Sequence, residues 1–144
     1  MIGGKKELTD AGTRVPLIVN WLGTTPSGEV SDDLIDLSDF LPTLLDLAGG
    51  SVPSNLTIDG VSFADRIQAK EFQSRSWVFS EWNNRRWVRN RDWKLYQDGT
   101  LYFMRDDVSE TSPIVDDSGI ADAGTARKEL DAVFDQLFPN GGKP

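Results

Sequence analysis

The sequence contains no cysteine and no histidine among its 144 residues, and each absence excludes a large class of chemistry. Without Cys there is no disulfide framework, no thiolate nucleophile and no Cys-ligated metal site. Without His there is no Ser–His catalytic pair, no imidazole ligand and no side chain that ordinarily titrates near neutral pH. Carboxylates, Lys, Tyr and Ser/Thr remain as the side chains that could carry a reaction.

Long apolar runs and an excess of basic charge are also missing. No run approaches the roughly 20 residues that a transmembrane helix needs, and residues 1–6 lack the apolar stretch of a secretory signal, so we expect no membrane partner. The net charge of −8 argues against general nucleic-acid binding, because phosphate contacts need a basic surface. None of these features assigns a cellular location. Hydrophobic residues make up 38% and charged residues 26%, which is the composition of a folded globular protein.

The first part of the chain, residues 1–70, has the pattern of a piece of an α/β layer. Residues 15–22 are a nearly continuous apolar run, typical of a strand buried on both faces. Apolar residues at spacings of three and four predict a helix over residues 38–48, and residues 61–69 are expected to form a short helix. A lone buried strand needs neighbours that satisfy its backbone. We therefore expect a fragment of a larger fold, or a fold completed by another chain.

The second part, residues 71–144, has the pattern of a small antiparallel sheet followed by a helix. Four aromatic and β-branched segments predict strands over residues 76–82, 86–89, 93–97 and 100–104. Asp98-Gly99 between two of them predicts a two-residue hairpin turn. Residues 125–138 carry one apolar helical face. The expected fold class is α+β: an edge portion of an α/β layer, then about four antiparallel strands with a C-terminal helix.

Residues 75–94 hold four of the five Trp and six basic residues against two acidic ones. This composition allows single-stranded nucleic acid or sugar to stack on exposed rings such as Trp82 and Trp87. It also allows a sheet with one face packed on the C-terminal helix and the other face charged. The alternation of apolar positions favours the sheet, and the acidic remainder of the chain argues against nucleic acid as a partner.

Five segments resemble, in order, motifs of the sulfatases of the alkaline phosphatase superfamily. Residues 4–19 are similar to the sulfatase segment GKGTxYEGGxRVPxIV, and residues 36–49 to D-x-x-P-T-L-L-x-x-A-G. The later motifs DG-x-S-hydrophobic, R-x-x-x-W-K-L/Y and LYDLxxDPxE are similar to residues 59–63, 89–96 and 101–110. Phe103 and Val108 depart from the last motif. The resemblance covers only the C-terminal third of a sulfatase.

This resemblance implies part of a sulfuric ester hydrolase. Lys5 aligns with the family's lysine that contacts the sulfate group, and Lys6 stands where the family usually has Gly. The alternative is that Lys5 is a solvated loop lysine without a functional role. The family's formylglycine motif C/S-x-P-x-R and its two His have no counterpart in this sequence. The calcium implied for the full-length family is bound upstream of the matching segment, so we expect no cofactor in this chain and no activity from the chain alone.

A second hypothesis comes from another functional class. The chain could be a non-catalytic interaction module that pairs through its sheet edges with itself, as a homo-oligomer, or with another chain. A sulfate ester would then be a partner only of a complete enzyme that includes the missing N-terminal portion. The sequence does not name the sulfated compound.

Overall fold

The structure, a computed structural model, describes residues 4–139, and its contacts divide the chain into two units. Unit 1 combines Met1–Val15 with Trp77–Pro144, and unit 2 comprises Pro16–Ser76. The glycine-rich N-terminal loop therefore belongs with the C-terminal sheet, and the helical segment that follows it forms a unit of its own.

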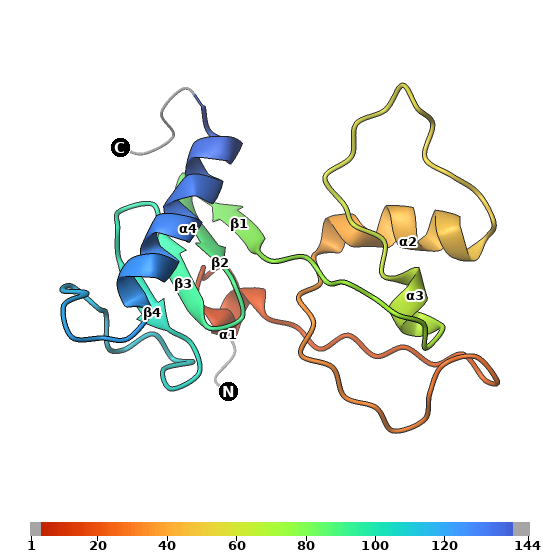
Figure 1. Cartoon of the computed structure of the whole chain (residues 1–144), viewed down its shortest axis with the longest axis horizontal. Helices are drawn as coiled ribbons and strands as arrows, with labels where there is room; N and C mark the ends of the chain where they lie inside the picture. The colour runs from red at the N-terminus through yellow and green to blue at the C-terminus, as the bar shows by residue number, and fades with distance from the viewer. Residues whose placement is uncertain (1–3, 140–144) are drawn as a thin grey trace. The chain divides into compact units, whose positions relative to one another are not determined.

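Unit 1 is built on a four-stranded antiparallel sheet whose strands lie in sequence order, with a helix against one face (Figure 1). Its elements are α1 (Asp10–Thr13), β1 (Val78–Trp82), β2 (Arg85–Arg89), β3 (Trp93–Tyr96), β4 (Leu101–Phe103) and α4 (Ala123–Leu137). The predicted α+β class, the four strands and the C-terminal helix are confirmed.

Two hairpin turns in the sheet follow from residues that adopt positive φ. Asn83 and Asn84, with φ of 54° and 61°, form the two-residue turn between β1 and β2 whose twist matches that of the strands. The two-residue turn predicted at Asp98-Gly99 is wrong in length. Gly99, at φ 85°, donates its N–H to the Tyr96 carbonyl, and the Tyr96 N–H reaches the Thr100 carbonyl, each at 2.9 Å, so the turn is one residue longer.

The two faces of the sheet differ because side chains alternate along each strand. Val88, Leu95 and Leu101 are paired across three strands, are 0% exposed and face α4. The helix supplies Leu130 and Phe134 to this core. The residues in between, on β2 and β3, point to the opposite face and are largely charged or aromatic with a polar group.

Unit 2 contains η1 (Leu37–Asp39), α2 (Phe40–Leu47) and α3 (Ala64–Ile67), which confirm the two predicted helices. Asp39, only 1% exposed, holds these pieces together. Its carboxylate lies 2.8 Å from the Arg75 guanidinium and accepts backbone N–H groups from Asp36 and Val61, each at 2.7 Å. A buried carboxylate satisfied in this way fixes the start of the helix against the loop before α3.

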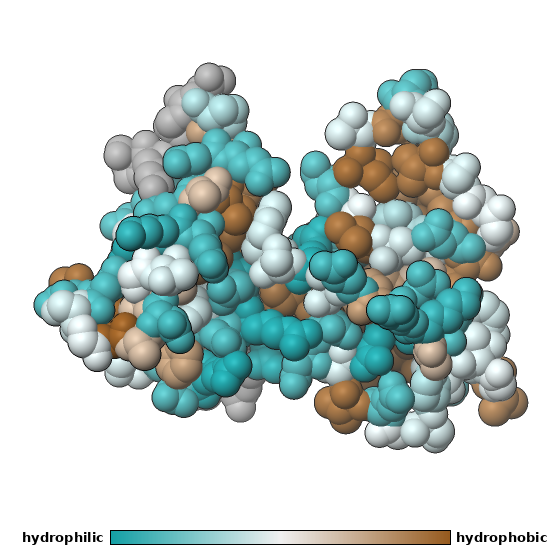
Figure 2. All heavy atoms as spheres, viewed as in Figure 1, coloured by the Kyte–Doolittle hydropathy of each residue, from teal (hydrophilic) through white to brown (hydrophobic). Residues whose placement is uncertain are grey.

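The buried strand predicted over residues 15–22 is not formed. Ile18 is 88% and Leu22 is 96% exposed, and the four-stranded sheet among residues 4–139 does not include this segment. The apolar pattern is present, but no described strand is available to satisfy its backbone groups. Leu41 and Leu44 of α2 are also exposed, and Figure 2 shows apolar side chains at the surface of unit 2.

Candidate functional site

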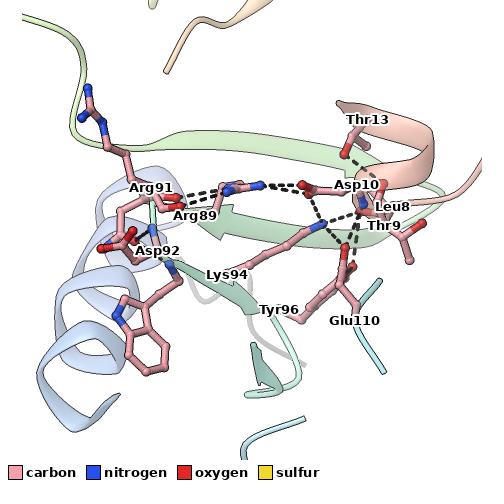
Figure 3. A network of polar contacts seen from close by, with 12 residues as sticks. Leu8, Thr9, Asp10, Thr13, Arg89, Arg91, Asp92, Lys94, Tyr96 and Glu110 are labelled. Atoms are coloured by element: carbon pink, nitrogen blue, oxygen red, sulfur yellow. Dashed lines mark hydrogen bonds and ion pairs between the residues drawn. The ribbon is translucent and has the colours of Figure 1, made fainter. Parts of the chain in front are cut away.

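A cluster of polar side chains lies on the sheet face opposite α4 (Figure 3). Arg89 comes from β2, Lys94 and Tyr96 from β3, Glu110 from the loop after β4, and Asp10 from the start of α1. We call these five residues the buried cluster. Asp10 and Glu110 are 100 residues apart in the sequence, so the fold alone brings them together.

Lys94 is the centre of the buried cluster and is 0% exposed. Its Nζ donates to the Leu8 carbonyl at 2.9 Å, to Asp10 Oδ1 at 3.3 Å and to Glu110 Oε1 at 2.7 Å. Three acceptors match the three N–H groups of an ammonium. Nζ also lies 4.5 Å from the centre of the Trp87 ring. Burial lowers the pKa of Lys94 from 10.5, and the two carboxylates oppose that shift.

Two carboxylates balance the two cations of the cluster. Asp10, 1% exposed, accepts from Nη1 of Arg89 at 2.8 and 3.0 Å, and its backbone N–H donates to Glu110 Oε1 at 2.8 Å. The Tyr96 hydroxyl donates to Glu110 and, at 3.3 Å, to the Leu8 carbonyl. Burial, reinforced by the hydrogen bond to Glu110, raises the pKa of Tyr96, so the phenol keeps the proton that it donates.

A tight turn presents Glu110 to the cluster. Glu110 has φ 56°, a left-handed conformation that non-glycine residues adopt at a cost. Asp107 stabilises the turn by accepting the backbone N–H groups of Thr111 at 2.9 Å and Ser112 at 2.8 Å. Burial acts to raise the pKa of Asp107, but these hydrogen bonds outweigh it and hold the pKa below its usual value.

Lys5 lies on the N-terminal loop that the cluster holds, but it is not a member of the cluster. Its side chain is exposed, in a turn closed by the Glu7 N–H to the Gly4 carbonyl at 2.9 Å. Lys6, the next residue in the turn, has φ 72°, which explains why glycine suits this position. A Cβ on Gly12 would lie 2.3 Å from the Gly4 and Glu7 carbonyl oxygens, so this loop is closely packed.

Sequence reasoning missed the roles of Asp10, Arg89, Lys94 and Glu110, although each stands at a charged position of a motif quoted above. The structure brings these four together, whereas Lys5 remains at the solvent side of the loop. One signal could have identified the site. Lys94 lies between two core residues of a short strand, and it is also one of the charged positions of a motif. A charged position that the motif specifies inside such a strand indicates a buried role rather than a solvated one.

Among residues 4–139 there is no group of three or more acidic side chains that could hold a metal ion. The carboxylates of Asp10 and Glu110 are instead engaged by Lys94 and Arg89. No helix in this part of the chain has the length and apolar composition to cross a membrane.

Comparisons with known proteins point to one family. The family model described as N-sulphoglucosamine sulphohydrolase, C-terminal, matches residues 4–132. The ulvan-active sulfatase of Formosa agariphila is 33% identical over 78 residues, which are 54% of this chain and 15% of that protein. Arylsulfatase G of Rattus norvegicus is 27% identical over 136 residues, 76% of this chain and 26% of that protein.

A solved structure described as a sulfatase from Bacteroides thetaiotaomicron superposes with a TM-score of 0.52 at 26% identity. The match covers 73% of this chain and 25% of that chain. The chain therefore spans about a quarter or less of the length of these relatives.

We predict that Lys6→Gly stabilises unit 1 by about 0.5–1 kcal/mol, because glycine adopts φ 72° without the Cβ clash that Lys suffers. Urea unfolding followed by fluorescence of the Trp residues of unit 1 measures this change. Lys5→Gly is the matched control in the same turn, at a residue without positive φ, and should destabilise slightly. Equal effects of the two variants would contradict the prediction.

We predict that Lys94→Met destabilises unit 1 by about 3–5 kcal/mol, because Asp10 and Glu110 are left with one cation between them. Adding Glu110→Gln restores the balance of buried charge, so the double variant should be less destabilised than the sum of the single ones by about 1–3 kcal/mol.

The same urea unfolding assay measures the unmodified chain, the two single variants and the double variant. Lys128→Met, which removes an exposed lysine of α4, is the control and should change stability little. Strictly additive effects of Lys94→Met and Glu110→Gln would show that the two side chains do not depend on one another.

Proposed function

Because the chain belongs to the sulfatase family, matching its C-terminal model over residues 4–132, we propose that it is the C-terminal part of a sulfuric ester hydrolase. The observation that carries this proposal is the family match together with the short span relative to the relatives. The exposed apolar residues 15–22 support it, because the rest of a larger fold would cover them.

Within such an enzyme, we assign Lys5 the contact to the sulfate group. An exposed lysine presents a compact ammonium that can bind a monoester oxygen through up to three hydrogen bonds. A fixed cation at that position stabilises negative charge that develops as the ester bond breaks. The ordered turn that carries Lys5 supports this role, since an electrostatic contact is effective when it is held in place before reaction.

The 144-residue chain should not hydrolyse sulfate esters alone. The sequence has no C/S-x-P-x-R motif from which the family's formylglycine nucleophile is made, and no His for proton transfer. An anion contact binds and orients a substrate, but the bond to sulfur breaks only when a nucleophile attacks.

In the complete enzyme of which this chain is the proposed C-terminal part, we expect Lys5→Ala to lower kcat/KM for an aryl sulfate by about 10²–10³-fold. Lys6→Gly is the matched control, because it removes the neighbouring charge and suits the backbone conformation, so it should leave kcat/KM within about threefold. Colorimetric release of the phenol measures both. Unchanged turnover after Lys5→Ala would remove Lys5 from the site, and turnover by the 144-residue chain would contradict its proposed inactivity.

A second candidate function is a non-catalytic interaction module. The exposed apolar side chains of Ile18, Leu22, Leu41 and Leu44 in unit 2 favour it, because large apolar side chains left in water are available for burial against a partner. A second copy of this chain is the partner that can be tested directly.

If this module self-associates, light scattering should show a concentration-dependent dimer at micromolar protein, and Ile18→Asp with Leu22→Asp should return it to a monomer. Val115→Asp, at a 90% exposed position of unit 1, is the control and should leave the dimer intact. A monomer at every concentration would rule out self-association.

A further inference from the structure

We propose that the buried cluster positions the turn that carries Lys5, so that Lys94, Glu110 and Tyr96 act on the sulfate contact through the N-terminal loop. The consequence for substrate rests on the function proposed above, whereas the mechanical link between cluster and turn does not. These three are positioning residues, because none of them is exposed to a ligand.

The first step is the attachment of the loop to the sheet. Lys94 Nζ and the Tyr96 hydroxyl both donate to the Leu8 carbonyl, at 2.9 and 3.3 Å. Arg89 Nη1 donates to the Asp10 carboxylate, and Glu110 accepts the Asp10 N–H, each at 2.8 Å. These contacts hold both the backbone and the side chains of the loop, so its orientation on the sheet is fixed as well as its distance. Figure 3 shows them converging on one short segment.

The second step carries that orientation from Asp10 to Lys5. The Gly4 N–H donates to the Ala11 carbonyl at 3.1 Å, and the Glu7 N–H returns to the Gly4 carbonyl at 2.9 Å. Gly12 packs so closely against the Gly4 and Glu7 carbonyl oxygens that a single added Cβ has no room. One hydrogen bond, from Gly4 to Ala11, and a close backbone contact at Gly12 therefore link the turn to the segment that the cluster holds.

The third step distinguishes positioning from bulk stability. The apolar core of unit 1 lies on the other face of the sheet, between β2, β3, β4 and α4. A buried ion cluster is a poor source of net stability, because the desolvation of its charges offsets most of their attraction. Directional bonds to Leu8 and Asp10 are, however, what fixes a loop in a single orientation.

Hydrogen exchange of the 144-residue chain tests the link without any assay of activity. In Glu110→Gln, the amides of Gly4, Glu7 and Gly12 should exchange about tenfold or more faster, while those of Val88 and Leu95 in the sheet keep their protection. Because Glu110→Gln could unfold unit 1, Tyr96→Phe is the second variant. It removes the hydroxyl, whose one proton is shared between Glu110 and the Leu8 carbonyl, without changing charge, and should accelerate the same turn amides about fivefold.

Tyr102→Phe, the same substitution on the neighbouring strand, is the matched control and should leave the turn unchanged. Unaltered exchange of the turn in a variant that keeps its sheet protection would overturn the proposal. Equal acceleration in turn and sheet for Tyr96→Phe would also overturn it, because the cluster would then only stabilise the fold.

A double-mutant cycle in the complete enzyme tests whether the effect of Tyr96 on turnover passes through Lys5. Tyr96→Phe should lower kcat/KM about fivefold when Lys5 is present and have no effect in a Lys5→Ala background. Full additivity would overturn the assignment of Tyr96 as a positioning residue for Lys5. Unchanged kcat/KM in Lys5→Ala alone would overturn the proposed function, and the exchange experiment would still decide whether the cluster holds the turn.

Discussion

Much of unit 1 depends on the burial of one ammonium group, that of Lys94. Removing such a group from water costs several kcal/mol unless its hydrogen bonds and its charge are satisfied inside the protein. On β3 itself there is no carboxylate to do so. The compensating groups come from Asp10 and Glu110, so the short helix α1 and the loop after β4 have to be ordered on the sheet before the strand can bury its lysine. The sheet thus dictates the position of both segments.

The two faces of the sheet contribute in different ways. On the face toward α4, apolar side chains such as Leu95 and Phe134 pack without directional preference, and this burial supplies free energy in proportion to area. On the opposite face, charged groups supply few but directional contacts. A sheet built in this way separates the source of its stability from the means by which it orients a loop. The loop can consequently be altered without removing a core side chain.

Local sequence patterns predict the helices and strands of unit 1 well, but they predict contacts between distant residues poorly. Alternation of Trp93, Lys94 and Leu95 is sufficient to predict a strand, and the α4 pattern is sufficient to predict a helix, because each depends on neighbours in the chain. Residues 15–22 show the limit, since an apolar run predicts that burial is favourable but does not supply the strand beside it. The alternation also predicts a charged face around Lys94, which is correct. That it is buried depends on contacts across about 100 residues, which no local pattern contains.

The separation of Asp10 from Glu110 also has a consequence for the order in which the chain folds during its synthesis. A ribosome adds roughly 5–20 residues each second, so the 100 residues between these two carboxylates take about 5–20 s to make. During that interval all of Pro16–Ser76 is produced, while the turn that carries Lys5 has nothing to dock on. Unit 2 is in effect an insertion between the two pieces of unit 1, and closing that long loop is an entropic barrier to pairing the first piece with the second.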